Sequence, residues 1–524
     1  MKNLPIGTQS FSVLRNTDCL YVDKTEHIYR MITTGRIYFL SRPRRFGKSL
    51  LVSTLEAVFK GQKELFDGLY IQDKWDWTQQ YPVIRLDFAG RSHRTGNELK
   101  VSLDQFLDEA ARKNNLSLEM TELSDKFGEL IEKLHLSTGQ QVVLLVDEYD
   151  KPITDHLSNP EVRETNKNTL HDFYQVLKAV DEHIRLIFLT GVSKFSGVSV
   201  FSALNNPDDI TIDEQYATIC GYTQEELESY FTEYFDETAR YNGMDRAGLL
   251  DAIRMWYDGY TWDGRTSVYN PFSTLLFFKK KRFDNYWFHT GTPTFLMELL
   301  KKRNNIAPVL EPVHVYSSAF EGYDPANIGE VSLLFQTGYL TVKKIDLSSR
   351  PPQYTLGIPN EEVRTSFLEY LLNSYSDYPT GLVRPLISDM QQHIHDGDTT
   401  ELEKNLRLLL ANIPSTLHIK REAYYHSMFL TWMKLLGFDI QGEVITSIGR
   451  IDAVWQQPEL TVVAEIKYSA GKVKADSLLN AAMEQIRDRR YYEKYLDRRV
   501  ILMAVAFTGK EVRCRLEEIG KKTP

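Results

Sequence analysis

The stretch Gly35-Arg-Ile-Tyr-Phe-Leu-Ser-Arg-Pro-Arg-Arg-Phe-Gly-Lys-Ser49 decides the fold of the first half of this chain. It starts as an apolar run that predicts a strand, continues as a basic loop, and leads into residues 50–59, whose apolar positions have helical spacing. A strand, a loop that ends in Gly-Lys-Ser and a helix are the context that a P-loop requires. In such a loop, backbone N–H groups bind phosphate, Lys48 reaches the outer phosphates and Ser49 can hold magnesium. A surface turn is the alternative for the tripeptide alone, and the flanking strand and helix favour phosphate binding.

One position of this loop departs from the usual spacing. In the pattern G-x-x-x-x-G-K-S/T, the first glycine falls at position 42, which here is Arg42. A β-carbon at this position changes the loop, so we expect nucleotide binding and leave open whether the nucleotide is turned over. The residues expected to bind it lie in the loop and at the helix start: Arg44, Arg45, Phe46, Gly47, Lys48, Ser49 and Leu50.

A second segment supplies the acidic partner of such a loop. In Gln141-Val-Val-Leu-Leu-Val-Asp-Glu-Tyr-Asp150, five consecutive apolar residues predict a strand buried on both faces of a parallel sheet. At its carboxyl end, Asp147 can orient magnesium and Glu148 can polarise the water that attacks the γ-phosphate. A third buried strand is expected over residues 184–190. The polar residues at and after its end are candidates for sensing the γ-phosphate, although a polar loop without a ligand is an equal alternative: Thr190, Ser193 and Lys194.

Near the C-terminus, two predicted strands carry charged residues on one face. Glu465-Ile-Lys467 lies in the apolar run 460–468, where alternate residues point the same way, so both charges share a face. Asp452 lies in the preceding strand, 449–455. A turn at residues 456–459 would make a hairpin and place Asp452 roughly opposite Glu465. The alternative is a surface hairpin with an ordinary Glu–Lys pair.

This arrangement suits hydrolysis of a phosphodiester. Asp452 and Glu465 can ligate one or two magnesium ions, which prefer oxygen ligands and retain water. The metal would supply Lewis acidity and a water of lowered pKa. Lys467 can orient that water or stabilise the charge that develops on phosphorus.

Composition limits the class of protein. A length of 524 residues predicts two to four domains, and 42% hydrophobic with 25% charged residues is typical of globular proteins. A formal charge of -9 argues against a protein that coats nucleic acid along its whole surface, but allows a local basic groove. The three cysteines lie far apart, which suits a reducing compartment. Without a signal-like N-terminus or a span of about 20 apolar residues, we expect a cytoplasmic protein with no membrane partner.

The expected domains follow in order along the chain. The fold class is α/β: a P-loop NTPase parallel sheet with a helical lid and a winged-helix unit, followed by a small α/β nuclease-like domain. The winged helix is suggested by residues 327–344, followed by residues 352–363, which together predict a helix and then a β-hairpin. Such a unit can serve either DNA contact or domain packing. The expected boundaries are 1–220 for the P-loop domain, 221–300 for the lid, 301–380 for the winged-helix unit, 381–414 for a helical linker and 415–524 for the nuclease-like domain.

Residues 1–300 resemble the bacterial AAA-ATPase-like family, whose members carry this arginine-rich P-loop. The resemblance rests on Leu4-Pro-Ile-Gly7, Tyr21-Val-Asp-Lys-Thr25, Ser41-Arg-Pro-Arg-Arg-Phe-Gly-Lys-Ser-Leu50, Trp256-Tyr-Asp-Gly-Tyr260, Val268-Tyr-Asn-Pro271 and Tyr286-Trp-Phe-His-Thr-Gly-Thr292. It implies ATP and Mg²⁺ as cofactors, and it makes Arg42 an attribute of the group.

Residues 415–515 resemble the PD-(D/E)XK nuclease superfamily, on the strength of Gly449-Arg-Ile-Asp452, Glu465-Ile-Lys467 and an expected helix over residues 481–495. The resemblance implies that Asp452 and Glu465 are metal ligands and that Lys467 is the catalytic lysine. It also implies Glu422 as an auxiliary acid and Gln485 as a helix residue facing the site, and Glu443 is a further acid nearby. The last strand expected in the sheet is the apolar run 500–507.

Two functions are consistent with these motifs. The first is an ATP-binding, ATP-hydrolysing protein that regulates a Mg²⁺-dependent nuclease cleaving DNA. The second is a nucleotide-dependent switch or scaffold that binds ATP and nucleic acid without cutting it. The sequence leaves open whether the chain forms a homo-oligomer.

Overall fold

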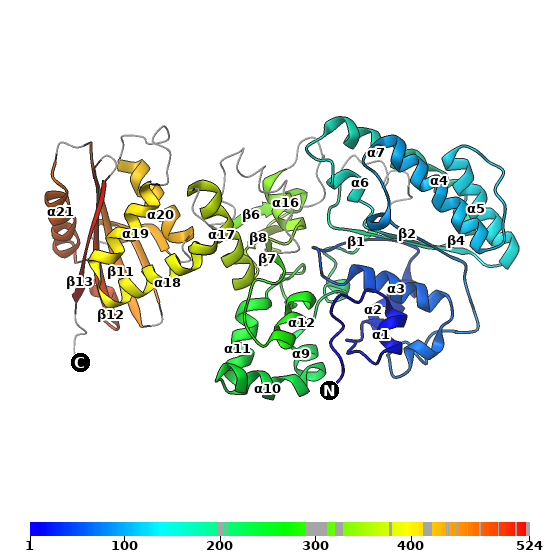
Figure 1. Cartoon of the computed structure of the whole chain (residues 1–524), viewed down its shortest axis with the longest axis horizontal. Helices are drawn as coiled ribbons and strands as arrows, with labels where there is room; N and C mark the ends of the chain where they lie inside the picture. Colours follow the sequence, from blue (N-terminus) through cyan, green and yellow to red (C-terminus); the bar gives the residue numbers. More distant parts are fainter. Residues whose placement is uncertain are drawn as a thin grey trace. The chain divides into compact units, whose positions relative to one another are not determined.

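The chain divides into two compact units, Met1–Val363 and Arg364–Pro524, which are described separately (Figure 1). The computed structural model describes residues 1–195, 204, 207–288, 312–319, 329–376, 380–411, 422–435, 438, 440–446, 449–457, 459–470, 473–490, 492–508 and 511–519. No helix among these residues is long and apolar enough to span a bilayer.

The first unit is built on a parallel five-stranded sheet in the order β2-β3-β4-β1-β5. Its strands are β1 (Ile37–Ser41), β2 (Val83–Asp87), β3 (Val142–Asp147), β4 (Ile184–Gly191) and β5 (Asp208–Asp209). The fully apolar interior of β3 is buried along its whole length, as expected for a strand covered on both faces. The order confirms the predicted α/β sheet and brings the ends of β1 and β3 to the same edge, on either side of β4.

Helices cover both faces of this sheet. Figure 1 shows α1 (Phe11–Asn16), α2 (Thr25–Thr34) and α3 (Lys48–Phe59) on one side, and α4 (Gly96–Lys113), α5 (Leu123–Thr138) and α7 (Pro160–Gln175) on the other. The short helix α6 (Lys151–Thr154) follows β3 directly. This three-layer arrangement is the one that a buried parallel sheet requires.

The predicted helical lid is present. It comprises α9 (Gln224–Tyr230), α10 (Thr232–Asn242), α11 (Arg246–Tyr257) and α12 (Pro271–Lys280). Its aromatic residues form a core with the N-terminal segment, in which Phe231 stacks on Phe278 at 5.0 Å and Leu20 packs alongside. The aromatic clusters of this region therefore serve packing.

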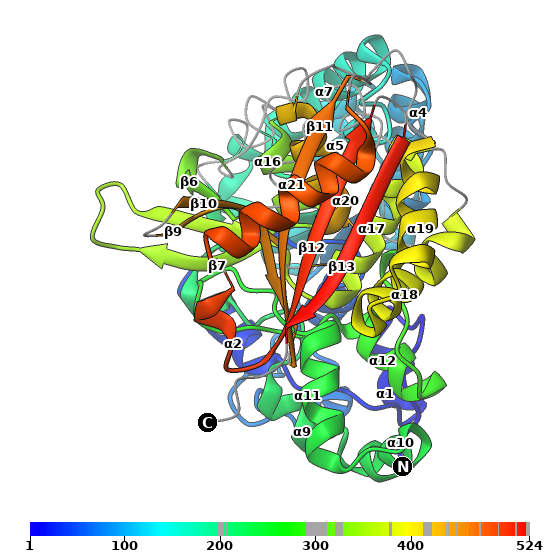
Figure 2. The same cartoon turned by 90° about the vertical axis from the view of Figure 1, so that its left-hand side faces the viewer.

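A small antiparallel sheet completes the first unit, in the order β6-β8-β7. The predicted helix and hairpin correspond to α16 (Glu330–Gln336), β7 (Thr341–Asp346) and β8 (Gln353–Gly357), and the added strand is β6 (Val313–Tyr316). The hairpin projects from the unit in Figure 2, whereas its base packs inward: Thr341 Oγ1 accepts a hydrogen bond from Thr261 N at 2.8 Å. The winged-helix-like element thus packs on the ATPase-like unit.

The second unit contains a mixed sheet in the order β13-β12-β11-β10-β9. Its strands are β9 (Ile440–Thr446), β10 (Gly449–Gln456), β11 (Leu460–Ser469), β12 (Arg499–Thr508) and β13 (Glu511–Ile519). Helix α21 (Ala475–Asp488) covers one face, and α18 (Thr380–Asp396), α19 (Thr399–Ala411) and α20 (Glu422–Leu435) lie on the other (Figure 1). Helix α17 (Glu361–Ser376) begins at the division between the units.

Three details of the sequence prediction for this unit are wrong. The expected last strand, 500–507, is followed by β13, whose alternating charged residues hid it from a search for apolar runs. Strand β9 was also missed. The helix expected over 481–495 is α21, which begins at Ala475 and ends at Asp488, because Leu479, Ala482, Met483 and Ile486 form its buried stripe.

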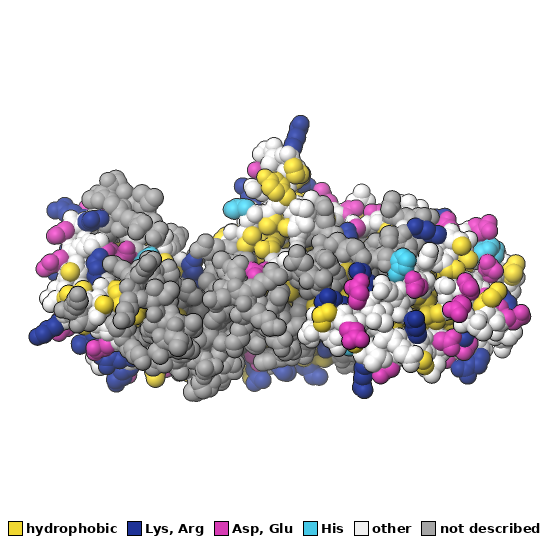
Figure 3. All heavy atoms as spheres, turned by 90° about the horizontal axis from the view of Figure 1, so that it is seen from above, with side chains coloured by type: hydrophobic (Ala, Val, Ile, Leu, Met, Phe, Trp, Pro, Cys, Tyr) yellow, Lys and Arg dark blue, Asp and Glu magenta, His cyan; other side chains and the backbone are white. Residues whose placement is uncertain are grey.

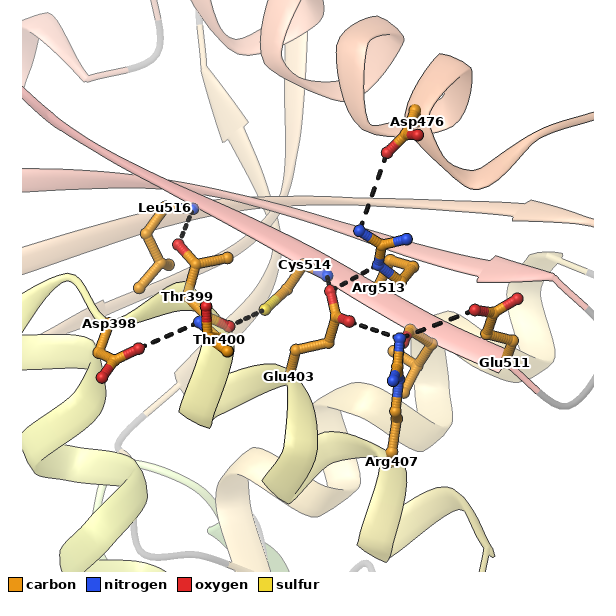
Figure 4. A network of polar contacts seen from close by, with 11 residues as sticks. Asp398, Thr399, Thr400, Glu403, Arg407, Asp476, Glu511, Arg513, Cys514 and Leu516 are labelled. Atoms are coloured by element: carbon orange, nitrogen blue, oxygen red, sulfur yellow. Dashed lines mark hydrogen bonds and ion pairs between the residues drawn. The ribbon is translucent and has the colours of Figure 1, made fainter.

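Within the segment predicted as a helical linker, 381–414, helix α19 packs against the sheet through a network around Glu403 (Figure 4). Its carboxylate accepts from the Arg513 guanidinium at 2.8 Å and from Cys514 N at 3.2 Å, and it also pairs with Arg407 at 2.5 Å. The Thr399 hydroxyl accepts from Leu516 N at 3.3 Å. Helix α19 therefore belongs to the second compact unit.

Glu403→Ala is expected to destabilise the packing of α19 on β13 by about 1–3 kcal/mol, because it leaves the Cys514 N–H without this acceptor and removes one carboxylate partner from two guanidinium groups. Hydrogen exchange of peptides from α19 and β13 measures this local effect. The matched control is Glu401→Ala on the same helix: its side chain is 44% exposed, and it pairs with Lys404 at the surface. Equal protection in both variants would contradict the prediction.

Candidate functional site

The loop after β1 has the geometry of a phosphate-binding loop. Gly47 has φ 93°, a left-handed conformation that favours glycine, and α3 begins at the next residue. The buried Lys48 ammonium donates to the carbonyl oxygens of Arg42 and Pro43 at 2.9 and 3.0 Å. Burial lowers the pKa of Lys48, although the Asp147 carboxylate opposes that shift. A phosphate group would replace the two carbonyls as partner of this ammonium.

Arg42 stands where the usual pattern has glycine, and its side chain points away from the phosphate pocket. The fully buried guanidinium lies 3.9 Å over the Trp262 ring and donates to the carbonyl oxygens of Thr211 and Tyr216 at 2.8 and 3.2 Å. Burial lowers the pKa of Arg42 to about 10. The β-carbon is thus accommodated by a stacking and hydrogen-bonding site that ties the loop to distant segments.

Acidic side chains gather at the carboxyl edge of β2 and β3. Asp87 pairs with Asp147 in the strand register, and Glu148 follows at φ 52°. Asp147 is 1% exposed, and among the described residues neither of its carboxylate oxygens has a hydrogen-bond partner. Burial raises the pKa of Asp147, although the Ser49 hydroxyl and the Lys48 ammonium oppose that shift. Burial also raises the pKa of Glu148, against the charges of Lys48 and Lys151. Two buried orphan oxygens beside Ser49 fit a Mg²⁺ ion, which commonly takes one or two carboxylates with waters and phosphate oxygens.

A pocket of about 380 Å³ joins the loop to this acidic edge. Seven residues predicted from the sequence line it: Arg44, Arg45, Gly47, Lys48, Ser49, Leu50 and Glu148. A smaller, mainly apolar pocket of about 70 Å³ adjoins it and shares Gly47 and Leu50. Phe46 borders this second pocket and packs edge-on against Tyr260, with ring centroids 4.8 Å apart.

None of the three predicted γ-phosphate sensors lines the larger pocket, although Ser193 borders a small cavity together with Arg44 and Glu148. The buried Thr190 hydroxyl donates to Leu40 O at 2.8 Å, and the Lys194 ammonium pairs with Asp209 at 2.6 Å. Ser193 is fixed by its backbone N–H, which donates to Asp150 at 2.8 Å. Asp150, which the sequence analysis left without a role, therefore anchors the loop after β4.

Residues that follow the lid helices in the sequence also contact the P-loop and the segment after β4. The Trp287 indole N–H donates to Arg44 O at 3.0 Å, and Lys194 N donates to the Gln336 side chain at 3.0 Å. Gly338, at φ 90°, lies so close to Pro43 that a β-carbon would come within 2.8 Å of its ring. These contacts were unforeseen from the sequence. They join Trp287 and Gly338 to the P-loop, and the end of α16 to the segment after β4.

In the second unit, the hairpin brings together the predicted carboxylates. The register pairs Ala453 with Ala464, which places Asp452 and Glu465 at adjoining positions of β10 and β11. The Asp452 carboxylate accepts from Ile466 N at 2.9 Å, and the Lys467 ammonium donates to Glu465 at 2.9 Å. The Asp452 carbonyl oxygen is 3.0 Å from His426 Nε2 of α20.

Glu465 carries the strongest sign of a ligand. Its side chain is 1% exposed, and its second oxygen, Oε2, is buried without a partner. Burial and the neighbouring Asp452 raise its pKa to about 7, although Lys467 opposes the shift. Within the described side chains, no group of three His, Cys, Asp or Glu residues forms a metal site. A Mg²⁺ ion would therefore rest on these two carboxylates, with water and substrate oxygens.

Three further residues were predicted for this site: Glu422, Glu443 and Gln485. Helix α20 begins at Glu422, and Glu443 lies in β9, but both side chains lie outside the described residues. Gln485 is half-buried on α21. One turn later, Arg489 acts on Glu465, since its charge lowers the pKa of that carboxyl. Arg489 was missed because nothing local distinguishes it among the arginines that end this helix.

Magnesium binding to the second unit is expected to strengthen as the pH rises from 6 to 8. The ligand must be deprotonated, and the pKa of Glu465 is raised from 4.5 to about 7. Without metal, the folded state holds this proton more tightly than the unfolded state, so its contribution to stability falls as the pH rises from 4.5 to about 7. Calorimetric titration with Mg²⁺ at both pH values measures the effect. Glu465→Gln should remove the pH dependence, and an unchanged dependence in that variant would contradict the assignment.

Both units match known protein families. The fold and the two sites define a P-loop NTPase unit joined to a nuclease-superfamily unit. The model described as predicted AAA-ATPase matches residues 5–201, and that of the PD-(D/E)XK nuclease superfamily matches residues 420–517. A protein of Azotobacter chroococcum mcd 1, described as an uncharacterized protein in the vnfD 5' region, is 39% identical over 502 residues, with 94% of each chain covered. The chain belongs to this family of predicted AAA-ATPases with a C-terminal PD-(D/E)XK nuclease superfamily domain.

Proposed function

We propose that the chain binds and hydrolyses ATP in its first unit, and that the nucleotide state regulates a Mg²⁺-dependent nuclease in the second unit that cleaves DNA. The observation that carries the nuclease is Glu465, a buried carboxylate with an unpartnered oxygen beside Asp452 and Lys467. An ordinary surface Glu–Lys pair would not bury a carboxylate at 1% exposure, because desolvation of a charged oxygen that has no hydrogen-bond partner is costly.

In the first unit, the two adjoining pockets suit the two ends of a nucleotide. Lys48, Arg44 and the backbone at the start of α3 would bind the phosphates in the larger pocket. The base would enter the apolar pocket, between Tyr21, Val22 and Tyr222. Bound Mg²⁺ would neutralise phosphate charge, held by Ser49 and Asp147. Glu148 would orient the attacking water and receive its proton.

In the second unit, Asp452 and Glu465 would hold Mg²⁺, which supplies Lewis acidity and an acidic water. Lys467 donates to Glu465 and is 23% exposed, so its ammonium can also meet a phosphate oxygen. It would stabilise the negative charge that develops during attack on phosphorus. Described acidic and basic side chains are interspersed on the face shown in Figure 3, so a DNA partner would be held locally and not over a uniformly basic surface.

The direct test is to incubate purified full-length protein with Mg²⁺ and supercoiled, linear or single-stranded DNA, and with RNA, in the presence and absence of ATP. Cleavage that depends on Mg²⁺ and Asp452, and that changes with nucleotide, supports the proposal. Tight ATP binding with negligible turnover and no cleavage would instead favour the non-cleaving switch. Light scattering with and without ATP tests for a homo-oligomer, and fractionation of cells tests the proposed cytoplasmic location.

A further inference from the structure

Lys151 is a second lysine at the phosphate pocket, supplied by the far side of the site. It begins α6, directly after the acidic end of β3. It lines the larger pocket together with Lys48 and Glu148, and it also borders a small adjoining cavity beside Arg44. The P-loop thus contributes cations from one side and Lys151 contributes one from the other.

The Lys151 ammonium is held by one carboxylate. Its Nζ lies 2.9 Å from Asp155 Oδ2, one helical turn away, and the lysine side chain remains 26% exposed. Although burial opposes the charged form, hydrogen bonds from His93 and Lys151 lower the pKa of Asp155 to about 2. The carboxylate is therefore charged throughout the neutral range.

His93 lies in the segment between β2 and α4, and it contacts the Asp155 carboxylate. Its Nδ1 is 2.7 Å from Arg91 O, a backbone carbonyl. Its Nε2 is 3.0 Å from the same Asp155 oxygen that meets Lys151. The buried Asn166 amide also donates to His93 O at 3.0 Å and to Pro152 O at 2.8 Å, which joins the two segments. Lys151 is thus one end of a chain of polar contacts that runs through Asp155 to His93.

The lining of the larger pocket places Lys151 beside Glu148, the residue that would orient the attacking water. In phosphoryl transfer, negative charge spreads over the γ-phosphate oxygens, and a fixed cation supplied in cis or by a partner stabilises it.

We propose that Lys151 is a built-in cation for the γ-phosphate, positioned by Asp155 and His93, so that the ATPase site distinguishes a nucleoside triphosphate from a diphosphate. This assignment rests on the proposed nucleotide site. Lys151 would contact the γ-phosphate itself, whereas Asp155 and His93 are positioning residues that aim its side chain.

The test compares the affinities of the full-length protein for Mg·ATP and Mg·ADP by calorimetry, together with its ATP hydrolysis. Lys151→Met is expected to reduce the ratio of ATP to ADP affinity by about tenfold or more, and hydrolysis by about 10²-fold or more. Lys151→Arg should retain part of both. Asp155→Asn should also reduce the ratio while leaving the ADP affinity near that of the wild type. The matched control is Lys167→Met: this lysine of α7 pairs with Glu164 at 3.2 Å and is absent from the pocket lining.

Each outcome separates this inference from the function on which it rests. If the wild type binds ATP more tightly than ADP and Lys151→Met leaves that ratio unchanged, the inference is overturned while the nucleotide site stands. An equal loss of ATP and ADP affinity would also overturn it, since it would mean that Lys151 only balances the acidic edge. If the wild type binds neither nucleotide better than Lys48→Ala does, both the inference and the proposed nucleotide site fail.

Discussion

Glu465→Gln is expected to lower DNA cleavage by about 10³-fold or more while leaving ATP binding intact, because it replaces an anionic metal ligand by a neutral amide of the same shape. The glutamate oxygen Oε2 is buried without a hydrogen-bond partner, and the other oxygen accepts from Lys467. The amide can keep the second contact, but it cannot supply the charge that Mg²⁺ requires. Initial rates of plasmid nicking at saturating Mg²⁺ measure the effect.

The control for this substitution is Glu459→Gln. Glu459 is exposed just before β11 begins, so it tests loss of a nearby charge without loss of the ligand. Its cleavage rate should equal that of the wild type. Retention of wild-type cleavage by Glu465→Gln would show that Glu465 is not a ligand of the catalytic Mg²⁺. Absence of cleavage in the wild type as well as in the variant would favour a recognition role for the second unit.

Lys48→Ala is expected to weaken ATP binding by about 10- to 150-fold, the equivalent of roughly 1.5–3 kcal/mol for a hydrogen bond to a charged group. The buried ammonium now bonds only to the carbonyl oxygens of Arg42 and Pro43, so it is available to phosphate at the head of the loop. Hydrolysis should fall below detection, and cleavage of DNA should lose its dependence on ATP. Calorimetry and a phosphate-release assay give the two measurements.

Lys60→Ala is the matched control for Lys48→Ala. Lys60 follows the other end of α3, is 46% exposed, and pairs with Glu56 one turn away. Surface pairs of this kind contribute little, so ATP affinity should be unchanged. Equal ATP affinity in the wild type and Lys48→Ala would show that the loop does not bind phosphate as proposed.

The sequence by itself determined the elements that local patterning controls. The apolar runs predicted β1, β3, β4, β11 and β12, since strands buried on both faces must be apolar throughout. The two-residue period of β10 and β11 was enough to place Asp452 beside Glu465. The Gly-Lys-Ser tripeptide predicted the start of α3, because the left-handed backbone of Gly47 is a local preference of glycine.

Only the tertiary structure decided what depends on partners distant in the chain. Arg42 departs from the P-loop pattern, and its accommodation requires Trp262, which local spacing could not reveal. Likewise, Lys151 pairs with Asp155, which in turn contacts the distant His93. Asp147 lies beside Asp87 because β2 and β3 pair in the sheet. Asp147 and Glu465 are buried because many segments of their units pack around them, and that burial leaves oxygens of both carboxylates without a partner among the described residues. Periodicity determines which face a residue occupies, but burial, pairing and charge state depend on what the rest of the chain places against that face.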